Sequence, residues 1–232
     1  MYNLRWVLMI IMLKSLVKIL PYASFSSKAV QAIANRQRII KHFRKTVTSE
    51  IEYEEKNFKT MGDIDKIKAM GYTFIESPNS VLMKLEKSFD ELIVEIRYYA
   101  DDSPELNTEQ QTQDTAKEFS LVIEYKYGGG LWIDCVIVNE EYTVLKVCYY
   151  KELRKMIDMT NIKRAVDIGS EYTGPDFIRL PKEIQNSFIE YINSLEINKD
   201  ILEFIVKSAK EKEVKLYHNW LTQMKEFTNE YL

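Results

Sequence analysis

The residues that could carry catalysis in this chain are few and lie far apart. The only two histidines, His42 and His218, fall on helical patterns that are predicted to face polar surroundings. A catalytic histidine needs a nucleophile or an orienting carboxylate within hydrogen-bonding reach. The sequence contains no Gly-x-Ser-x-Gly motif, no phosphate-binding loop and no His-Glu-x-x-His motif. It therefore predicts no catalytic residues, and we expect a protein that is not an enzyme.

Acidic residues gather in residues 100–117, a long polar link between predicted strands. This stretch holds five acids, one lysine and almost nothing apolar, which is typical of a mobile, solvated loop. Its acids lack the one-three-five ligand spacing and the central glycine of an EF-hand loop. We therefore expect no specific metal site here, while weak, diffuse cation binding stays open. No other pattern predicts a cofactor.

The glycine run and the two cysteines are better explained by sheet structure than by function. Gly128-Gly129-Gly130 lies between two strand patterns, so it predicts a hairpin turn and not a phosphate cradle. Cys135 and Cys148 form no CxxC motif and no Cys/His cluster. A turn at residues 139–141 would place Cys135 opposite about Leu145, which is out of register for a disulfide with Cys148. We expect two thiols in a reducing compartment.

Charge is divided unevenly along the 232 residues, whose formal net charge is −3. Residues 1–49 contain nine Lys/Arg and no acid. The chain from Glu50 onward therefore holds 23 basic and 35 acidic residues, a formal charge of −12. This division predicts an addressing segment followed by an acidic body. Such a body argues against direct binding of a nucleic-acid backbone.

Two targeting interpretations fit the basic segment. A secretory signal would use Arg5, the apolar run 6–13 and small residues near Ala23. A mitochondrial transit peptide would use the acid-free stretch, and the lack of disulfide usage favours it. We assign residues 1–35 to a transit peptide, whose end could extend to about 49, and residues 36–232 to one acidic domain. The apolar run is well short of the ~20 residues that cross a bilayer, so no membrane span is expected.

Hydrophobic periodicity predicts the elements that position these residues. Alternating three- and four-residue steps from about residue 28 predict one long helix that ends before Gly62. A period of two between Tyr72 and Tyr150, with short turns, predicts six strands paired as an antiparallel meander. The run 172–180 predicts a seventh strand, and the polar link 151–171 has room for a helical turn.

Two helices are predicted to follow Pro181, a residue that suits the first position of a helix. Asn198 is the predicted N-cap of the second. The last helix and the first are both long with narrow apolar stripes, which favours antiparallel pairing between them. The residues expected to pair these helices, or to hold a trimer together, are Ile40, Val47, Ile51, Phe58, Leu216, Trp220 and Phe227.

A spaced pattern of aromatic, aliphatic and polar residues marks the last sixty residues. It comprises Tyr172-Thr173-Gly174-Pro175-Asp176-Phe177, Leu180, Ile184-Gln185, Phe188, Tyr191-Ile192, Leu202, Phe204-Ile205, Lys212-Glu213, Tyr217 and Trp220-Leu221. With Glu50-Ile51-Glu52-Tyr53-Glu54 and Leu131-Trp132-Ile133-Asp134-Cys135, this pattern resembles the mitochondrial glycoprotein family, which includes the complement-subcomponent-q-binding protein. Two positions depart from the family pattern, Pro181 in place of Asp and Leu195-Glu196 in place of a basic-Gly pair.

The resemblance implies an α+β fold with a highly twisted seven-stranded antiparallel sheet, flanked by one N-terminal and two C-terminal helices. It also implies a homotrimer: an acidic scaffold or chaperone of the mitochondrial matrix that binds basic proteins and supports mitochondrial ribosome assembly, translation and respiratory function. The candidate partner-binding acids are Asp101, Asp102, Glu105, Glu109, Asp114 and Glu118, although they equally suit a merely solvated loop. The alternative is an accessory role with RNA-binding proteins in mitochondrial RNA processing. Direct RNA binding would need a basic patch, and the lysines of residues 207–215 keep that open.

Overall fold

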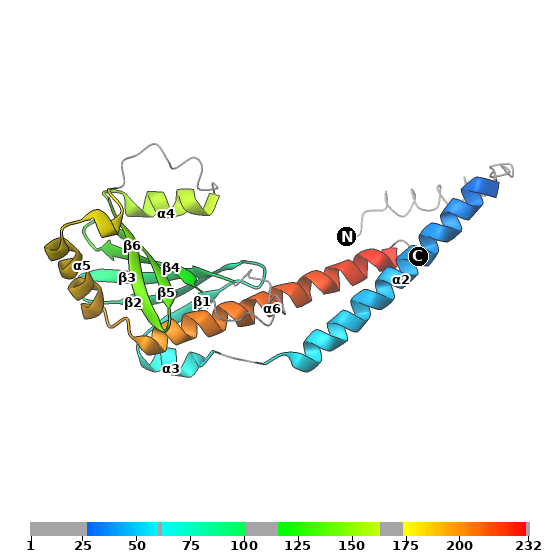
Figure 1. Ribbon diagram of the computed structural model, residues 1–232, viewed down its shortest axis with the longest axis horizontal. Coiled ribbons are helices and arrows are strands. Elements are labelled where there is room, and N and C mark those ends of the chain that lie inside the picture. The colour runs from blue at the N-terminus through cyan, green and yellow to red at the C-terminus, as the bar shows by residue number, and fades with distance from the viewer. Residues whose placement is uncertain (1–26, 60–61, 101–115, 163–173, 231–232) are drawn as a thin grey trace, which may run out of the picture. The chain divides into compact units, whose positions relative to one another are not determined.

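Six antiparallel strands form one meander sheet in chain order (Figure 1). They are β1 (Thr73–Glu76), β2 (Leu82–Ser88), β3 (Leu92–Tyr99), β4 (Lys117–Tyr125), β5 (Gly130–Val138) and β6 (Glu141–Tyr150). Each strand pairs with its neighbours in sequence, as the period of two and the short links predicted. The structure is a computed structural model that describes residues 27–59, 62–100, 116–162 and 174–230.

The glycine run joins β4 to β5 as a hairpin, as predicted. Gly128 and Gly129 have φ angles of 94° and 74°, in the left-handed region that glycine occupies without strain. Gly130 is required for a different reason, because a Cβ there would lie 2.1 Å from the carbonyl oxygen of Ile123. Each of the three positions therefore needs glycine to form the turn or to let the strands approach.

One face of the sheet, called here the inner face, forms the hydrophobic core with three helices. These are α3 (Ile64–Ala69), α5 (Lys182–Ser194) and α6 (Lys199–Glu230). Alternate residues of β3, β4 and β5 enter the same buried cluster as residues of the helices. Its fully buried members include Ile67, Ile96, Leu121, Ile133, Ile192 and Ile205. The alternation in the sequence therefore identified the core side of the sheet correctly.

The other face of the sheet, called here the outer face, is covered in part by α4 (Leu153–Ile162). Leu153 and Ile157 pack on Val122 in a second, smaller buried cluster. The link after β6 thus contains a helix of 10 residues, longer than the helical turn that was predicted. Leu153 and Ile157 lie four residues apart, so in this short helix a single helical repeat marks the buried side.

The predicted seventh strand is absent from the described part of its range. Residues 172–173 lie outside the described residues, and Phe177–Arg179 form a 3-10 helix, η2, next to β6. Gly174 has a φ of 90°, and Pro175 lacks the N–H group that a sheet ladder requires. Apolar alternation alone could not reveal this break. The described sheet therefore has six strands and not the seven predicted.

The ends of α5 and α6 follow the capping signals. Pro181 directly precedes α5, one position earlier than predicted. Asn198 is the N-cap of α6, because its Oδ1 accepts hydrogen bonds from the N–H groups of Asp200 and Ile201 at 3.1 and 3.3 Å. Between the helices Glu196 has a φ of 61°, in the left-handed region that favours glycine. An ion pair with Lys87 helps to hold this turn.

The chain divides into two compact units, residues 53–220 and residues 1–52 with 221–232. In the second of these, the end of α6 contacts α2 (Ser27–Asn57). Arg44 donates hydrogen bonds to the hydroxyl and the backbone carbonyl of Thr228 at 3.4 and 2.7 Å. The predicted pairing of the first and last helices is therefore present. Of the described helices, none is long and apolar enough to cross a membrane.

The seven residues predicted to pair the helices or join a trimer differ in exposure. Val47 and Ile51 are buried, whereas Ile40 and Leu216 are half-buried. The remaining three are exposed to 40%, 50% and 50%, in the order Phe58, Trp220 and Phe227. The buried residues thus pack within the chain. Contact of the exposed ones with another chain stays a prediction.

Candidate binding cleft

A cleft of about 730 Å³ lies within the unit of residues 53–220. Its walls come from the end of α2, from the end of β1 with the following turn, and from the middle of α6. The lining residues are Glu54, Glu55, Phe58, Glu76, Pro78, Lys212, Val214, Lys215, His218 and Asn219. The volume is in the range of pockets that bind small ligands or large side chains.

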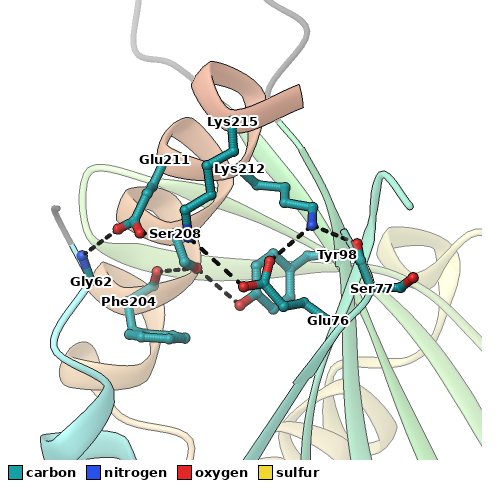
Figure 2. Close-up of polar contacts among 9 residues, drawn as sticks. All are labelled: Gly62, Glu76, Ser77, Tyr98, Phe204, Ser208, Glu211, Lys212 and Lys215. Atoms are coloured by element: carbon teal, nitrogen blue, oxygen red, sulfur yellow. Dashed lines mark hydrogen bonds and ion pairs between the residues drawn. The ribbon is translucent and has the colours of Figure 1, made fainter. Parts of the chain in front are cut away.

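The base of the cleft is fixed by Lys212, whose side chain is only 2% exposed. Its ammonium group donates to a carboxylate oxygen of Glu76 at 2.9 Å and to the backbone carbonyl of Ser77 at 2.6 Å (Figure 2). A buried ammonium group is tolerated only when it is paired and hydrogen-bonded. Lys212 therefore ties α6 to the end of β1.

A second lysine in the cleft is compensated in the same way. Lys215 lies 2.9 Å from a carboxylate oxygen of Glu211 and 3.8 Å from the other oxygen of Glu76. Glu211 also accepts a hydrogen bond from the N–H of Gly62 at 3.3 Å (Figure 2). Both cleft lysines are thus neutralised by carboxylates of the protein itself, which leaves them unsuited to bind an anion.

Behind this wall, Tyr98 joins β3 to α6. The hydroxyl of Ser208 donates to the carbonyl oxygen of Phe204 at 2.6 Å, so the Tyr98 hydroxyl donates to Ser208 Oγ at 2.9 Å. Burial raises the pKa of Tyr98 far above its usual range. The phenol therefore remains protonated and acts as a fixed donor within the core (Figure 2).

The mouth of the cleft has a different charge balance. Glu54 and Glu55 come from the last turns of α2, where the backbone carbonyls add negative partial charge. Glu55 lies 3.3 Å from Nε2 of His218. The ring of Phe58 is beside them and is 40% exposed. The arrangement offers carboxylates and an aromatic surface to a cation, but it contains no nucleophile with an adjacent base.

A separate ionic cluster lies on the outer face of the sheet. Arg97 pairs with Glu95 at 2.8 Å, and Lys84 lies 3.2 Å from the second oxygen of Glu95. The Arg97 guanidinium lies 5.5 Å from the ring centroid of Trp132. Trp132 in turn donates to Asp134 at 2.7 Å. Because these charges compensate one another and are largely buried, the cluster serves the packing of the sheet.

The candidate partner-binding acids lie mostly outside the described residues. This applies to Asp101, Asp102, Glu105, Glu109 and Asp114. Glu118 is described, and it is exposed on β4 opposite Val136 of β5. No assembly of these six acids can therefore be read from the structure, and their role stays a prediction.

Sequence reasoning missed the cleft, because its walls come from positions far apart in the chain. Glu55 and His218 meet although 163 residues separate them. His218 does face polar surroundings, as predicted. Lys212 belongs to the pattern that carried the family resemblance, but an isolated lysine in a charged helix gives no signal of burial.

Three of the four lysines of residues 207–215 pair with carboxylates. Lys207 pairs with Glu203 on the same helix face. Lys212 and Lys215 pair with Glu76 and Glu211 in the cleft. A phosphate backbone would have to compete with these carboxylates, which weakens the case for direct contact with RNA.

Metal-ligating side chains are not gathered in the described part of the chain. There, no group of three or more His, Cys, Asp or Glu side chains is placed to hold an ion. Cys135 and Cys148 are both buried and are not joined to each other. An irregularity after Asp134 places Cys135 opposite Val144, one residue from the predicted Leu145. The prediction that the cysteines are out of register is confirmed.

Similar proteins support the resemblance seen in the sequence. The chain is 20% identical over 217 residues to the mitochondrial acidic protein mam33 of Schizosaccharomyces pombe, covering 87% of this chain and 78% of that protein. A solved Leishmania major protein of unknown function, described as a homologue of human p32, has a TM-score of 0.63 at 18% identity. It is matched over 81% of this chain and 98% of that chain.

The Trypanosoma brucei p22 protein has a TM-score of 0.64 at 16% identity, with 82% of this chain and 98% of that chain covered. These two structures share the α+β fold with an antiparallel sheet. A family model described as mitochondrial glycoprotein matches residues 47–228. The resemblance found in the C-terminal residues is thereby confirmed, and the chain belongs to the mitochondrial glycoprotein family.

Proposed function

We propose that this chain is a non-enzymatic acidic scaffold or chaperone that binds Lys/Arg-rich proteins. In this role it supports mitochondrial ribosome assembly, translation and respiratory function. The observation that carries the proposal is the formal charge of −12 from Glu50 onward, in a member of this family. Family membership makes it a mitochondrial protein, with the matrix as the expected compartment. Residues 1–35, or up to about 49, then act as its transit peptide.

The mechanism is electrostatic attraction to an acidic assembly. Three copies of the chain would concentrate negative charge and attract basic proteins over about a Debye length, ~8–10 Å at physiological salt. Trp220 and Phe227, each 50% exposed, are the proposed contacts between copies. Light scattering on the purified chain gives its mass directly. A monomeric mass would remove the trimer from this mechanism.

The acids at residues 101–118 are the proposed contact points for basic partners. The test replaces Asp101, Asp102 and Asp114 by Asn, and Glu105, Glu109 and Glu118 by Gln. Binding of labelled polylysine is then followed by fluorescence anisotropy at low and at physiological salt. We expect the low-salt affinity to fall by more than about tenfold, since six local charges are removed.

A matched control separates local contacts from the effect of total charge. Six exposed acids elsewhere are replaced by their amides: Glu52, Asp90, Asp158, Glu183, Glu190 and Glu226. Both variants lose the same charge, so the loop variant should bind more weakly than the control. Equal losses would assign the attraction to overall charge and not to this loop. Unchanged binding in both variants would contradict the electrostatic mechanism.

A further inference from the structure

We propose that the cleft between the end of α2, the turn after β1 and α6 binds an arginine side chain of a basic partner. The inference rests on the proposed function and gives it a defined site, separate from residues 101–118. The occupant is an arginine within a short apolar segment. Its guanidinium group lies at Glu54 and Glu55, and its neighbouring residues lie against the apolar wall.

Charge selects a cation at the mouth of the cleft. Lys212 and Lys215 are already neutralised by Glu76 and Glu211. Within the described residues Glu54 makes no ion pair, and Glu55 has His218 as its neighbour at 3.3 Å. The carbonyl end of α2 adds to the negative potential at the same place. The carboxylates of Glu54 and Glu55 would repel an anionic ligand and attract a cation.

The apolar wall favours arginine over lysine. Phe58, Pro78 and Val214 line the cleft beside the carboxylates. A guanidinium group is planar and more weakly hydrated than an ammonium group. It can therefore stack on the exposed ring of Phe58 while it donates to a carboxylate. The methylene groups of arginine and the adjacent apolar residues would cover the remaining wall.

The cleft is prepared for a ligand by the contacts beneath it. Lys212 is held by Glu76 and Ser77, and Glu211 by Lys215 and Gly62. These contacts fix α6 relative to the end of β1 without using the carboxylates at the mouth. Binding would therefore require little reorganisation of the base, which favours affinity for a small partner segment.

The test uses a labelled, acetylated and amidated peptide, Ala-Leu-Arg-Leu-Ala, and the same peptide with citrulline in place of arginine. Citrulline keeps the size and removes the charge. Binding to the full chain is measured by fluorescence anisotropy. We expect the citrulline peptide to bind about tenfold more weakly, which corresponds to one partly exposed charge-assisted contact. Equal binding of the two peptides would overturn the proposal without requiring any protein variant.

Protein variants then locate the contact. The double variant Glu54→Gln/Glu55→Gln should lower the affinity for the arginine peptide about tenfold. The variant Phe58→Ala should lower it about threefold. The control Glu183→Gln/Glu190→Gln removes the same charge from exposed positions of α5 and should stay within twofold. Circular dichroism confirms that each variant is folded. A cleft variant that binds like the control would overturn the assignment of the site.

Two further outcomes separate this inference from its alternatives. If a second copy of the chain fills the cleft, the peptide will lower the mass of the assembly in light scattering, and the proposal fails. The variant with amides at the six acids of residues 101–118 should keep its affinity for the short peptide within twofold. Its affinity for polylysine should fall, as stated above. If the wild-type chain does not bind polylysine, the proposed function is wrong. If the chain binds polylysine but binds the arginine and citrulline peptides equally well, only the inference about the cleft is wrong.

Discussion

Strand β3 presents Val94, Ile96 and Tyr98 to the inner face of the sheet and Glu95 and Arg97 to the outer face. All five residues are buried to 5% exposure or less. On the inner face, burial removes apolar surface from water beneath the helices. On the outer face, the buried charges of Glu95 and Arg97 require compensation. They pair with each other, Lys84 pairs with Glu95, and the ring of Trp132 lies beside Arg97.

The difference shows that burial has opposite energetic meanings on the two faces. An apolar side chain on the inner face contributes roughly in proportion to its buried area. A charge on the outer face contributes only while its partner remains, because an unpaired buried charge is strongly destabilising. The inner face therefore stabilises the fold.

The largest expected effect compares adjacent residues of β4. Leu121 is fully buried in the inner core, and Val122 packs against α4 on the outer face. We expect Leu121→Ala to lower the free energy of unfolding by about 4 kcal/mol, because it leaves a large cavity in the main cluster. Val122→Ala should cost about 2 kcal/mol, since fewer atoms are removed from a smaller cluster. Urea unfolding at one protein concentration measures both, and equal losses would contradict the distinction between the clusters.

The second prediction concerns the ion pair on the outer face. Arg97→Ala should lower the free energy of unfolding by about 3 kcal/mol, because Glu95 would keep a buried carboxylate with only Lys84 nearby. The double variant Glu95→Leu/Arg97→Met removes both charges and keeps the volume. It should recover most of that loss in the same assay. A double variant less stable than Arg97→Ala would show that the pair itself stabilises the sheet.

The smallest effect is a pH dependence that arises on the inner face. Burial raises the pKa of the Cys135 thiol to about 12. As the pH rises above about 9, the unfolded chain loses this proton before the folded chain does. The stabilisation is therefore complete below that pH and is lost towards pH 12. At pH 9.5 the loss should stay below about 1 kcal/mol.

The control for this effect is Cys135→Ala, which removes the thiol and leaves the buried tyrosines in place. Its stability should fall less steeply between pH 8.5 and 9.5 than that of the wild-type chain. Identical slopes would assign the dependence to other groups.

In alkylation with iodoacetamide, Cys135 should react more slowly than Cys148, which lies on the outer face where the local cluster is smaller.

Local patterns were sufficient where one element depends on its own sequence. The period of two located all six described strands, and the glycine run located the hairpin after β4. The amide side chain of Asn198 identified the start of α6 for the same reason, since a cap acts on the next turn of its own helix. The pattern failed at residues 174–180, where Gly174 and Pro175 interrupt the strand that was expected.

The sequence by itself determined the meander, the long first and last helices, the separation of the two cysteines and the family. These follow from periodicity, turn residues and spacing, which act over a few positions. Only the tertiary structure decided that Lys212 is buried on Glu76 and that Glu54, Glu55 and Phe58 meet α6 at a cleft. A charged residue in a sequence is equally compatible with solvent or with a partner. The fold decides between them by bringing together side chains more than a hundred residues apart.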